Sequence, residues 1–237
     1  MKPAKPIVPL IYRTAGLLVS TTGILLHLES KHFVQAGFMI RHNLAYYTIE
    51  TNIWAALLFA ALLIRTLVLR KRQGRWTTAH LSPGLQGAAA FYITMTMLGF
   101  WLLLAPTTGL GKNPYLLVSS LILHTVTPLL TLGDFLFFCP HGHLTRRHAA
   151  LWLIYPALYL GMVMICSRFL TQPYYSFQMG GRTVDLMVPY PFLDPSVLGP
   201  WGVAAAVILL AAVFYGLGLL FVFLDRRAAA SGSAVLS

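Results

Sequence analysis

Six apolar runs constrain this chain more than any other feature of its sequence. Each run is about 20 residues or longer, the length that an α-helix needs to cross the hydrocarbon layer of a bilayer. Backbone N–H and C=O groups in lipid must be satisfied internally, and a helix does this within one segment. We therefore predict membrane-spanning helices at residues 7–28, 44–69, 84–106, 115–138, 149–170 and 199–224.

The overall composition agrees with this interpretation. Hydrophobic residues make up 57% of the 237-residue chain and charged residues 10%, whereas soluble domains carry about 25% charged residues. The fold class that we expect is an all-α integral membrane bundle. We assign residues 1–237 to a single six-helix transmembrane domain, with residues 225–237 as a short cytoplasmic tail, of which residues 228–237 are small and polar and have a disordered composition,.

The positive charge follows the ends of the apolar runs. A formal net charge of +11 would suggest a nucleic-acid partner in a soluble protein,. Here the bases lie in the connections, where an excess of Lys and Arg marks the cytoplasmic side. We therefore expect both termini in the cytoplasm, the bilayer as partner, and no nucleic acid. The basic residues on the side that we assign to the cytoplasm are Lys2, Lys5, Arg70, Lys71, Arg72, Arg75, Arg146, Arg147, Arg226 and Arg227. Those on the opposite side are Lys31, Arg41, Lys112 and Arg182.

A polar face opens the second run. Thr48, Thr51 and Asn52 follow a helical spacing of i, i+3 and i+4, so they share one side of the helix,. A membrane helix with such a face either holds a neighbouring helix by hydrogen bonds or lines a polar cavity.

The fourth run carries a histidine at membrane depth. An ionisable residue inside a membrane helix is a functional-site hypothesis by default, although His124 would also serve as interhelical glue,. Ser120 and Thr127 lie on the same face at i−4 and i+3. Pro128 removes a backbone hydrogen bond and frees the His124 carbonyl, which favours a cavity at this depth,.

Together, Thr48 and His124 suggest nucleophilic catalysis. A threonine hydroxyl is a weak nucleophile until a base takes its proton, and a neutral imidazole is the usual base near neutral pH. We expect a hydroxyl or a backbone carbonyl to orient His124, with Asp194 in an outer loop as an alternative. Asn52 is placed to donate to an oxyanion, and Thr51, Ser120 and Thr127 are further polar groups of the pocket.

Other polar groups have structural explanations. Arg13 and Asp134 lie near the inner ends of their helices and are expected to pair. His141 and His143 are more typical of a solvated basic loop than of a metal site, so we predict no metal and no cofactor,. The two cysteines of the chain form no CxxC motif,.

The longest connection, residues 171–198, is rich in proline and aromatic residues. Such a segment caps a bundle or lies in the membrane interface as an aromatic belt. The sharper alternative is a lid over the site, for which the candidate residues are Tyr190, Phe192 and Asp194.

These residues resemble a known family. The segment Tyr47-Thr48-Ile49 and the run from His124 to Pro128 resemble the androgen-induced protein and ADTRP family of membrane threonine hydrolases. Two further features look closest to the bacterial six-helix branch of that family. One is the fifth helix, with Trp152, Tyr155, Pro156 and Tyr159, and the other is the loop Tyr190-Pro191-Phe192-Leu193.

The resemblance implies a function. Eukaryotic members cleave fatty acid esters of hydroxy fatty acids (FAHFA) with a threonine and a histidine, and Thr48 and His124 are the matching positions. Thr51 is a nearby competitor for the nucleophile. We therefore expect a lipid ester hydrolase in a cytoplasmic membrane of bacterial type. The alternatives are a non-enzymatic lipid-binding protein or small transporter using the same polar pocket, and a structural subunit.

Overall fold

A computed structural model describes residues 7–29, 44–105, 114–170, 173–179 and 181–233. Five of the basic residues that we used for topology, Lys2, Lys5, Lys31, Arg41 and Lys112, lie outside these ranges. The chain divides into two compact units. The first contains Met1–His148 together with Leu220–Ser237, and the second contains Ala149–Leu219.

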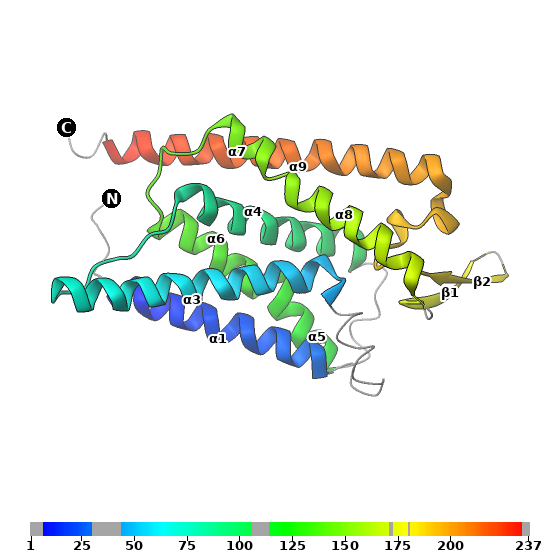
Figure 1. Ribbon diagram of the computed structural model, residues 1–237, viewed down its shortest axis with the longest axis horizontal. Helices are drawn as coiled ribbons and strands as arrows, with labels where there is room; N and C mark the ends of the chain where they lie inside the picture. The colour runs from blue at the N-terminus through cyan, green and yellow to red at the C-terminus, as the bar shows by residue number, and fades with distance from the viewer. Residues whose placement is uncertain (1–6, 30–43, 106–113, 171–172, 180, 234–237) are drawn as a thin grey trace. The chain divides into compact units, whose positions relative to one another are not determined.

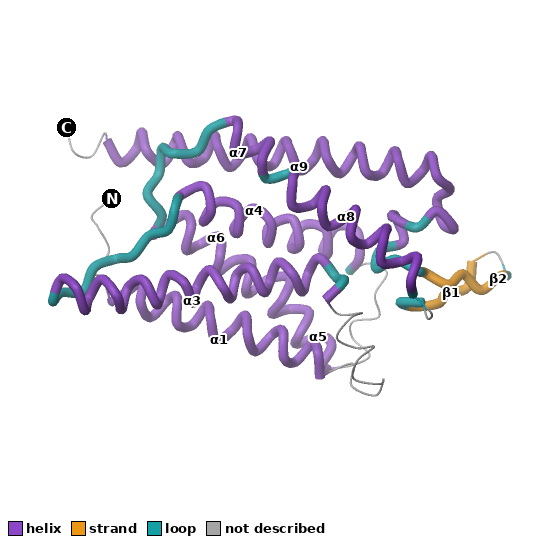
Figure 2. Tube along the Cα trace, in the orientation of Figure 1, coloured by secondary structure: helices purple, strands orange, loops and turns teal. Residues whose placement is uncertain are grey.

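The predicted fold class is confirmed, since the chain is all-α and its described part contains six helices long and apolar enough to cross a membrane. Figures 1 and 2 show that most of the described chain is helical and that its strands form a hairpin. The cytoplasmic orientation of the termini stays a prediction. The six candidate spans are Ile7–Leu28, Tyr47–Gln73, Pro83–Leu104, Leu117–Phe138, Arg146–Phe169 and Pro195–Ser231.

The first unit contains four of these spans. Figure 1 shows α1, α3, α4 and the α5–α6 rod running side by side. Two of the four contain a turn of wider π-helix, labelled η1 and η3. The elements are α1 (Ile7–Glu29), α3 (Tyr47–Gln73), α4 (Pro83–Gly99) with η1 (Phe100–Leu104), and α5 (Pro114–Leu121) with η3 (Ile122–Val126) and α6 (Thr127–Phe138).

Local sequence signals set the boundary between α3 and α4. α3 ends at Gly74, whose left-handed φ of 68° lets its N–H bond to the Arg70 carbonyl,. α4 begins with Ser82 as N-cap, whose hydroxyl accepts from the Leu85 N–H at 3.2 Å,. Pro83 follows at the first helical position, where its missing N–H has no consequence,.

The helices of this unit pack closely on one side and face outward with apolar side chains on the other. A Cβ added to Gly16 of α1 would lie 2.6 Å from the Phe59 ring of α3, so this glycine permits a close approach of the two helices,. Leu57 and Ile64, in contrast, are exposed on α3. An outward apolar face of this kind is suited to contact with lipid tails.

A buried ion pair joins α1 to α6, as predicted. Arg13 Nε donates to Asp134 Oδ1 at 2.6 Å, and both side chains are almost fully buried. Arg13 Nη1 also donates to the Ala79 carbonyl at 2.8 Å, and Gln86 Nε2 donates to Asp134 Oδ2 at 3.3 Å. The charged groups therefore find their partners within one cluster.

The second unit contains a hairpin that the sequence did not lead us to expect. Strands β1 (Tyr175–Met179) and β2 (Arg182–Leu186) pair antiparallel, and Gly181 in the turn has φ of 76°. The helical elements that belong wholly to this unit are α8 (Ile154–Cys166), η4 (Ser167–Phe169) and η5 (Pro191–Leu193).

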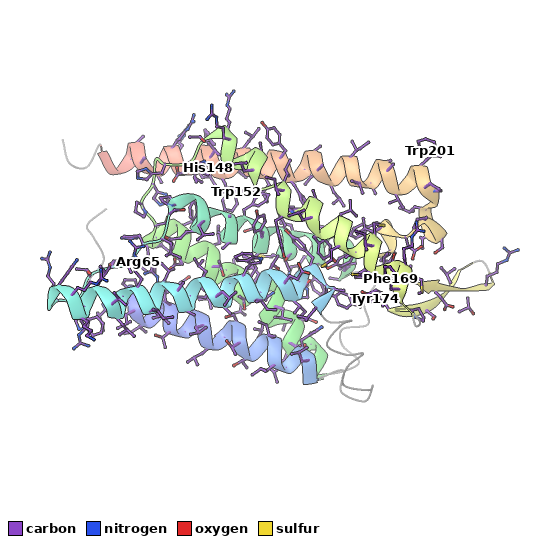
Figure 3. The ribbon with its side chains drawn as sticks, in the orientation of Figure 1. Arg65, His148, Trp152, Phe169, Tyr174 and Trp201 are labelled. Carbon is purple, nitrogen blue, oxygen red and sulfur yellow. The ribbon has the colours of Figure 1, made fainter. Side chains whose placement is uncertain are left out.

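Two helices, α7 (Arg146–Leu151) and α9 (Pro195–Ser233), continue from one unit into the other. Near the start of α9, Trp201 is 87% exposed and projects away from the helix (Figure 3).

The predictions for the C-terminal tail and the histidine loop are corrected. α9 continues to Ser233, through residues that we assigned to a disordered tail, because three consecutive alanines from Ala228 favour helix,. His141 is not a solvated loop residue, since its Nδ1 lies 3.1 Å from Asp225 Oδ1 and its Nε2 lies 2.9 Å from the Leu136 carbonyl oxygen.

Candidate active site

The structure brings Thr48 and His124 together. Thr48 is the second residue of α3, and its Oγ1 lies 3.2 Å from Nε2 of His124 in η3. Thr48 is 8% exposed and His124 is 6% exposed, so water screens this hydrogen bond little,. The two residues come from separate membrane-spanning helices of the first unit.

The second ring nitrogen of His124 fixes the tautomer. Nδ1 lies 2.9 Å from the Ser120 carbonyl oxygen, which can only accept, so Nδ1 carries a proton and donates,. In the neutral ring, Nε2 then presents a lone pair to Thr48, whose hydroxyl donates. This is the arrangement in which an imidazole acts as a general base toward a hydroxyl.

A backbone carbonyl therefore orients the base, which was one of our two expectations. The alternative, Asp194, has a different role. Its Oδ1 accepts from the Ser196 N–H at 2.8 Å and from the Ser196 hydroxyl, and its Oδ2 accepts from the Met187 N–H at 3.2 Å. Asp194 thus caps the start of α9.

A widened helical turn surrounds His124. Pro128 has no N–H to donate, and the chain just before it forms the π-helix η3 instead of an α-helical turn,. The carbonyl of His124 accepts from Trp101 Nε1 at 3.2 Å, and Trp101 also donates to the Thr125 hydroxyl at 3.0 Å. We expected a cavity to satisfy this carbonyl, and the Trp101 indole provides the partner instead.

Phe100 holds the imidazole from one face. Its ring stacks on the His124 ring with 3.6 Å between centroids and 13° between planes. Phe100 and Trp101 begin η1, so both π-helices contribute to the setting of His124. Sequence reasoning missed these two aromatic residues because they lie inside an apolar run and follow no polar spacing.

The expected role of Asn52 as an oxyanion donor is not supported. Its Nδ2 donates to the Thr48 carbonyl at 2.8 Å and to the Leu123 carbonyl at 3.1 Å, which uses both amide hydrogens,. Asn52 therefore bridges α3 and η3. Its Oδ1 is buried and has no hydrogen-bond partner among the described residues.

The remaining predicted pocket residues are buried but differ in their contacts. The Thr51 hydroxyl lies 2.6 Å from the Thr96 hydroxyl and 3.2 Å from the Thr48 carbonyl oxygen, so the bonds described for it include no base. Ser120 contributes its carbonyl to the site, as described above. Thr127 is fully buried, and its hydroxyl has no hydrogen-bond partner in the described part of the chain.

The candidate lid residues belong to the second unit. Tyr190 and Phe192 stack with ring centroids 5.3 Å apart and nearly parallel planes. Their role as a lid stays a prediction.

The described residues offer little support for metal or thiol chemistry. Within them, no group of three or more His, Cys, Asp or Glu side chains is arranged to hold a metal ion. Both cysteines are free. Burial, with smaller contributions from Asp134 and Asp225, raises the pKa of the Cys139 thiol to about 12, so this thiol is a poor nucleophile at neutral pH,.

Comparison with known proteins adds no identification. The chain matches no family model, and neither a curated protein nor a solved structure is significantly similar to it. The resemblance to the androgen-induced protein and ADTRP family therefore stays a prediction, and the functional argument depends on the geometry of the first unit.

Proposed function

We propose that this protein is an intramembrane hydrolase that cleaves a lipid ester, with Thr48 as nucleophile and His124 as general base. The observation that carries the proposal is the 3.2 Å contact between Thr48 Oγ1 and His124 Nε2, combined with the Nδ1 bond to the Ser120 carbonyl. This combination leaves the basic nitrogen facing the hydroxyl, which is how serine and threonine nucleophiles are activated.

The first half-reaction transfers the acyl group to Thr48. The Thr48 oxygen attacks the ester carbonyl carbon while its proton moves to His124 Nε2. The tetrahedral intermediate then collapses, the bond from the carbonyl carbon to the alcohol oxygen breaks, and Nε2 returns the proton to the leaving alcohol. The products are a free alcohol and an acyl-threonine ester.

The second half-reaction consumes one water. His124 Nε2 takes a proton from the water as its oxygen attacks the acyl carbon, and the same proton then returns to the Thr48 oxygen as the carboxylic acid leaves. Phe100 and the Ser120 carbonyl keep the ring in one orientation through both steps. Atoms and protons balance without a cofactor.

The oxyanion would lie at the positive end of α3. The helix dipole favours negative charge at the N-terminal end of a helix. Thr48 is the second residue of a 27-residue helix. An oxyanion formed beside its side chain therefore lies in the favourable field of α3, although the Ile49 and Glu50 N–H groups already donate to the Tyr46 carbonyl,.

The location of the pair suggests a lipid substrate. Thr48 and His124 lie in spans whose outer faces carry large exposed apolar side chains, such as Leu57 and Leu121. An ester with long alkyl arms partitions into the same layer as these helices. A fatty acid ester of a hydroxy fatty acid, the substrate class of the family that the chain resembles, has two such arms.

A lipid-binding protein or small transporter is the second candidate. Interrupted helices near a polar site are typical of transporters, and η1 and η3 are both departures from α-helix next to His124. In that case the bond between Thr48 and His124 is only interhelical glue.

Hydrolysis of a long-chain fluorogenic ester by protein in liposomes separates the two candidates. We expect Thr48→Val and His124→Gln each to reduce the rate by about 10²- to 10⁴-fold, the usual contribution of an assisted nucleophile. Thr51→Val is the matched control, because it removes a buried hydroxyl from the same helix face. Wild-type protein without hydrolysis, or a Thr48→Val variant as active as wild type, would overturn the proposal.

A further inference from the structure

Several buried hydroxyls on the helices of the first unit follow one rule, and Thr127 departs from it. A threonine or serine inside a helix usually donates to the carbonyl one turn back. Thr127 does not, although it is fully buried, and its Oγ1 has no partner among the described residues. Residues that follow the rule include Ser20, Thr66, Thr94 and Thr131, with bonds of 2.8, 2.8, 2.7 and 2.9 Å.

The carbonyl that Thr127 would normally use belongs to Leu123, which accepts a hydrogen bond from Asn52. Asn52 Nδ2 donates to this carbonyl at 3.1 Å, and η3 shifts the helical register just before Thr127. Asn52 itself keeps Oδ1 buried and without a partner in the described chain. Exchanging the amide N and O would place Oδ1 against two carbonyl oxygens, so the orientation is fixed.

Two buried polar atoms without partners in the described chain therefore belong to side chains near Leu123, since Asn52 contacts its carbonyl and Thr127 follows it by four residues. Asn52 Oδ1 can only accept a hydrogen bond, whereas Thr127 Oγ1 can donate or accept. A buried polar atom left unsatisfied destabilises the fold, and proteins commonly satisfy such atoms with an internal water that makes about three hydrogen bonds.

We propose that Asn52 Oδ1 and Thr127 Oγ1 bind one internal water molecule beside the Leu123 carbonyl. The water donates to Asn52 Oδ1 and exchanges a hydrogen bond with Thr127 Oγ1. Asn52 is one helical turn, about 6 Å, from Thr48. The site is therefore close to the nucleophile but on the far side of the Thr48 carbonyl, which Asn52 also contacts.

This water would serve the second half-reaction, a role that depends on the proposed function. Each turnover consumes one water after the apolar leaving group has filled the surroundings of Thr48. A water held one turn away, among buried helices, is available at that moment, and another water refills the site before the next turnover. Thr127 acts here as a positioning residue, because it contacts the water and not the acyl group.

The binding site itself is tested by hydroxyl-radical footprinting with mass spectrometry. Radicals formed from bound water modify neighbouring side chains even where bulk solvent does not reach. We expect Leu123, which is fully buried, to be modified in wild type and to lose this modification in Thr127→Val. Leu62 is the matched control, since it is equally buried in an apolar cluster with Leu58 and Ala89. Equal modification of Leu123 and Leu62 in wild type would overturn the water site.

The role of the water is tested by a burst experiment with a chromogenic ester. Thr127→Val should keep the burst amplitude, which reports acylation, while steady-state turnover falls about tenfold, the loss expected for one hydrogen bond. Thr127→Ser should restore turnover. Wild-type turnover in Thr127→Val would overturn the role. A wild-type protein without a burst would contradict the proposed function instead, and the footprinting result would still decide the water site.

Discussion

The first unit buries two polar clusters, and they differ in how their groups are satisfied. In the charged cluster, defined by Arg13, Asp134 and Gln86, the cation and the carboxylate bond to each other and to neighbouring amide groups. In the neutral cluster, defined by Thr48, His124 and their neighbours, a hydroxyl faces the basic nitrogen of an oriented ring.

We propose that the difference separates a structural role from a chemical one. Charges in a low-dielectric interior must be compensated by close partners, so the geometry of the charged cluster is explained by the requirements of burial. A hydroxyl and an imidazole are neutral, and burial requires only that each finds a hydrogen-bond partner, which backbone carbonyls provide for other hydroxyls of this unit,. Their alignment, together with the Phe100 stack, is what a nucleophile and its base need.

The comparison predicts that breaking the charged cluster mainly affects stability. Asp134→Ala leaves the Arg13 guanidinium buried without a counter-charge, and we expect it to reduce the free energy of unfolding by about 3–5 kcal/mol. Thermal unfolding in detergent measures this loss. The double variant Arg13→Leu with Asp134→Leu should recover most of it, because no buried charge remains. An Asp134→Ala variant as stable as wild type would show that the ion pair does not hold α1 to α6.

A smaller change in the neutral cluster should affect hydrolysis more than stability. Phe100→Leu removes a ring stack worth about 0.5–1.5 kcal/mol, so we expect hydrolysis to slow by about two- to tenfold. Phe91→Leu is the matched control on the same helix, since Phe91 is equally buried and packs edge-on against Phe221. Rates that fall equally in both variants would indicate general loosening of α4 and not orientation of His124.

The smallest expected effect concerns pH and lies next to the charged cluster. Burial and, secondarily, the nearby Arg13 charge lower the pKa of His80 below its usual 6.5. Below about pH 6.5 the unfolded chain binds a proton that folded His80 does not, so stability is lost as the pH falls. We expect His80→Gln to reduce the acid-side fall in unfolding temperature. If the unfolding temperature of His80→Gln falls at acid pH as steeply as that of wild type, His80 is not the cause of the acid-side loss of stability.

Much of the fold was predictable from the sequence. Length and hydropathy are sufficient for six helices, and the pairing of Arg13 with Asp134 follows from two opposite charges near the inner ends of apolar helices. The hairpin from Tyr175 to Leu186 was missed because prolines and aromatics nearby obscured its short alternation. The extension of α9 to Ser233 was missed because we gave small, polar composition more weight than helix propensity.

The candidate site was predictable in part. Polar spacing on two helices led to Thr48 and His124. Side chains on a helix point toward its N-terminal end. The His124 imidazole therefore lies closer to the start of its helix than the His124 backbone does, and nearer to Thr48. Neither the π-helices nor the contacts of Phe100 and Trp101 could be predicted, because nothing in an apolar run marks a change of helical register.

The central claim is that His124 activates the Thr48 hydroxyl. It is tested most directly by reacting the purified protein with a fluorophosphonate probe and locating the adduct by tandem mass spectrometry. The account predicts a covalent adduct on Thr48 in the wild type, kept in Thr51→Val and lost in His124→Gln. An adduct on Thr51 or on a serine, with Thr48 unmodified, would contradict it, as would equal modification of Thr48 when His124 is replaced.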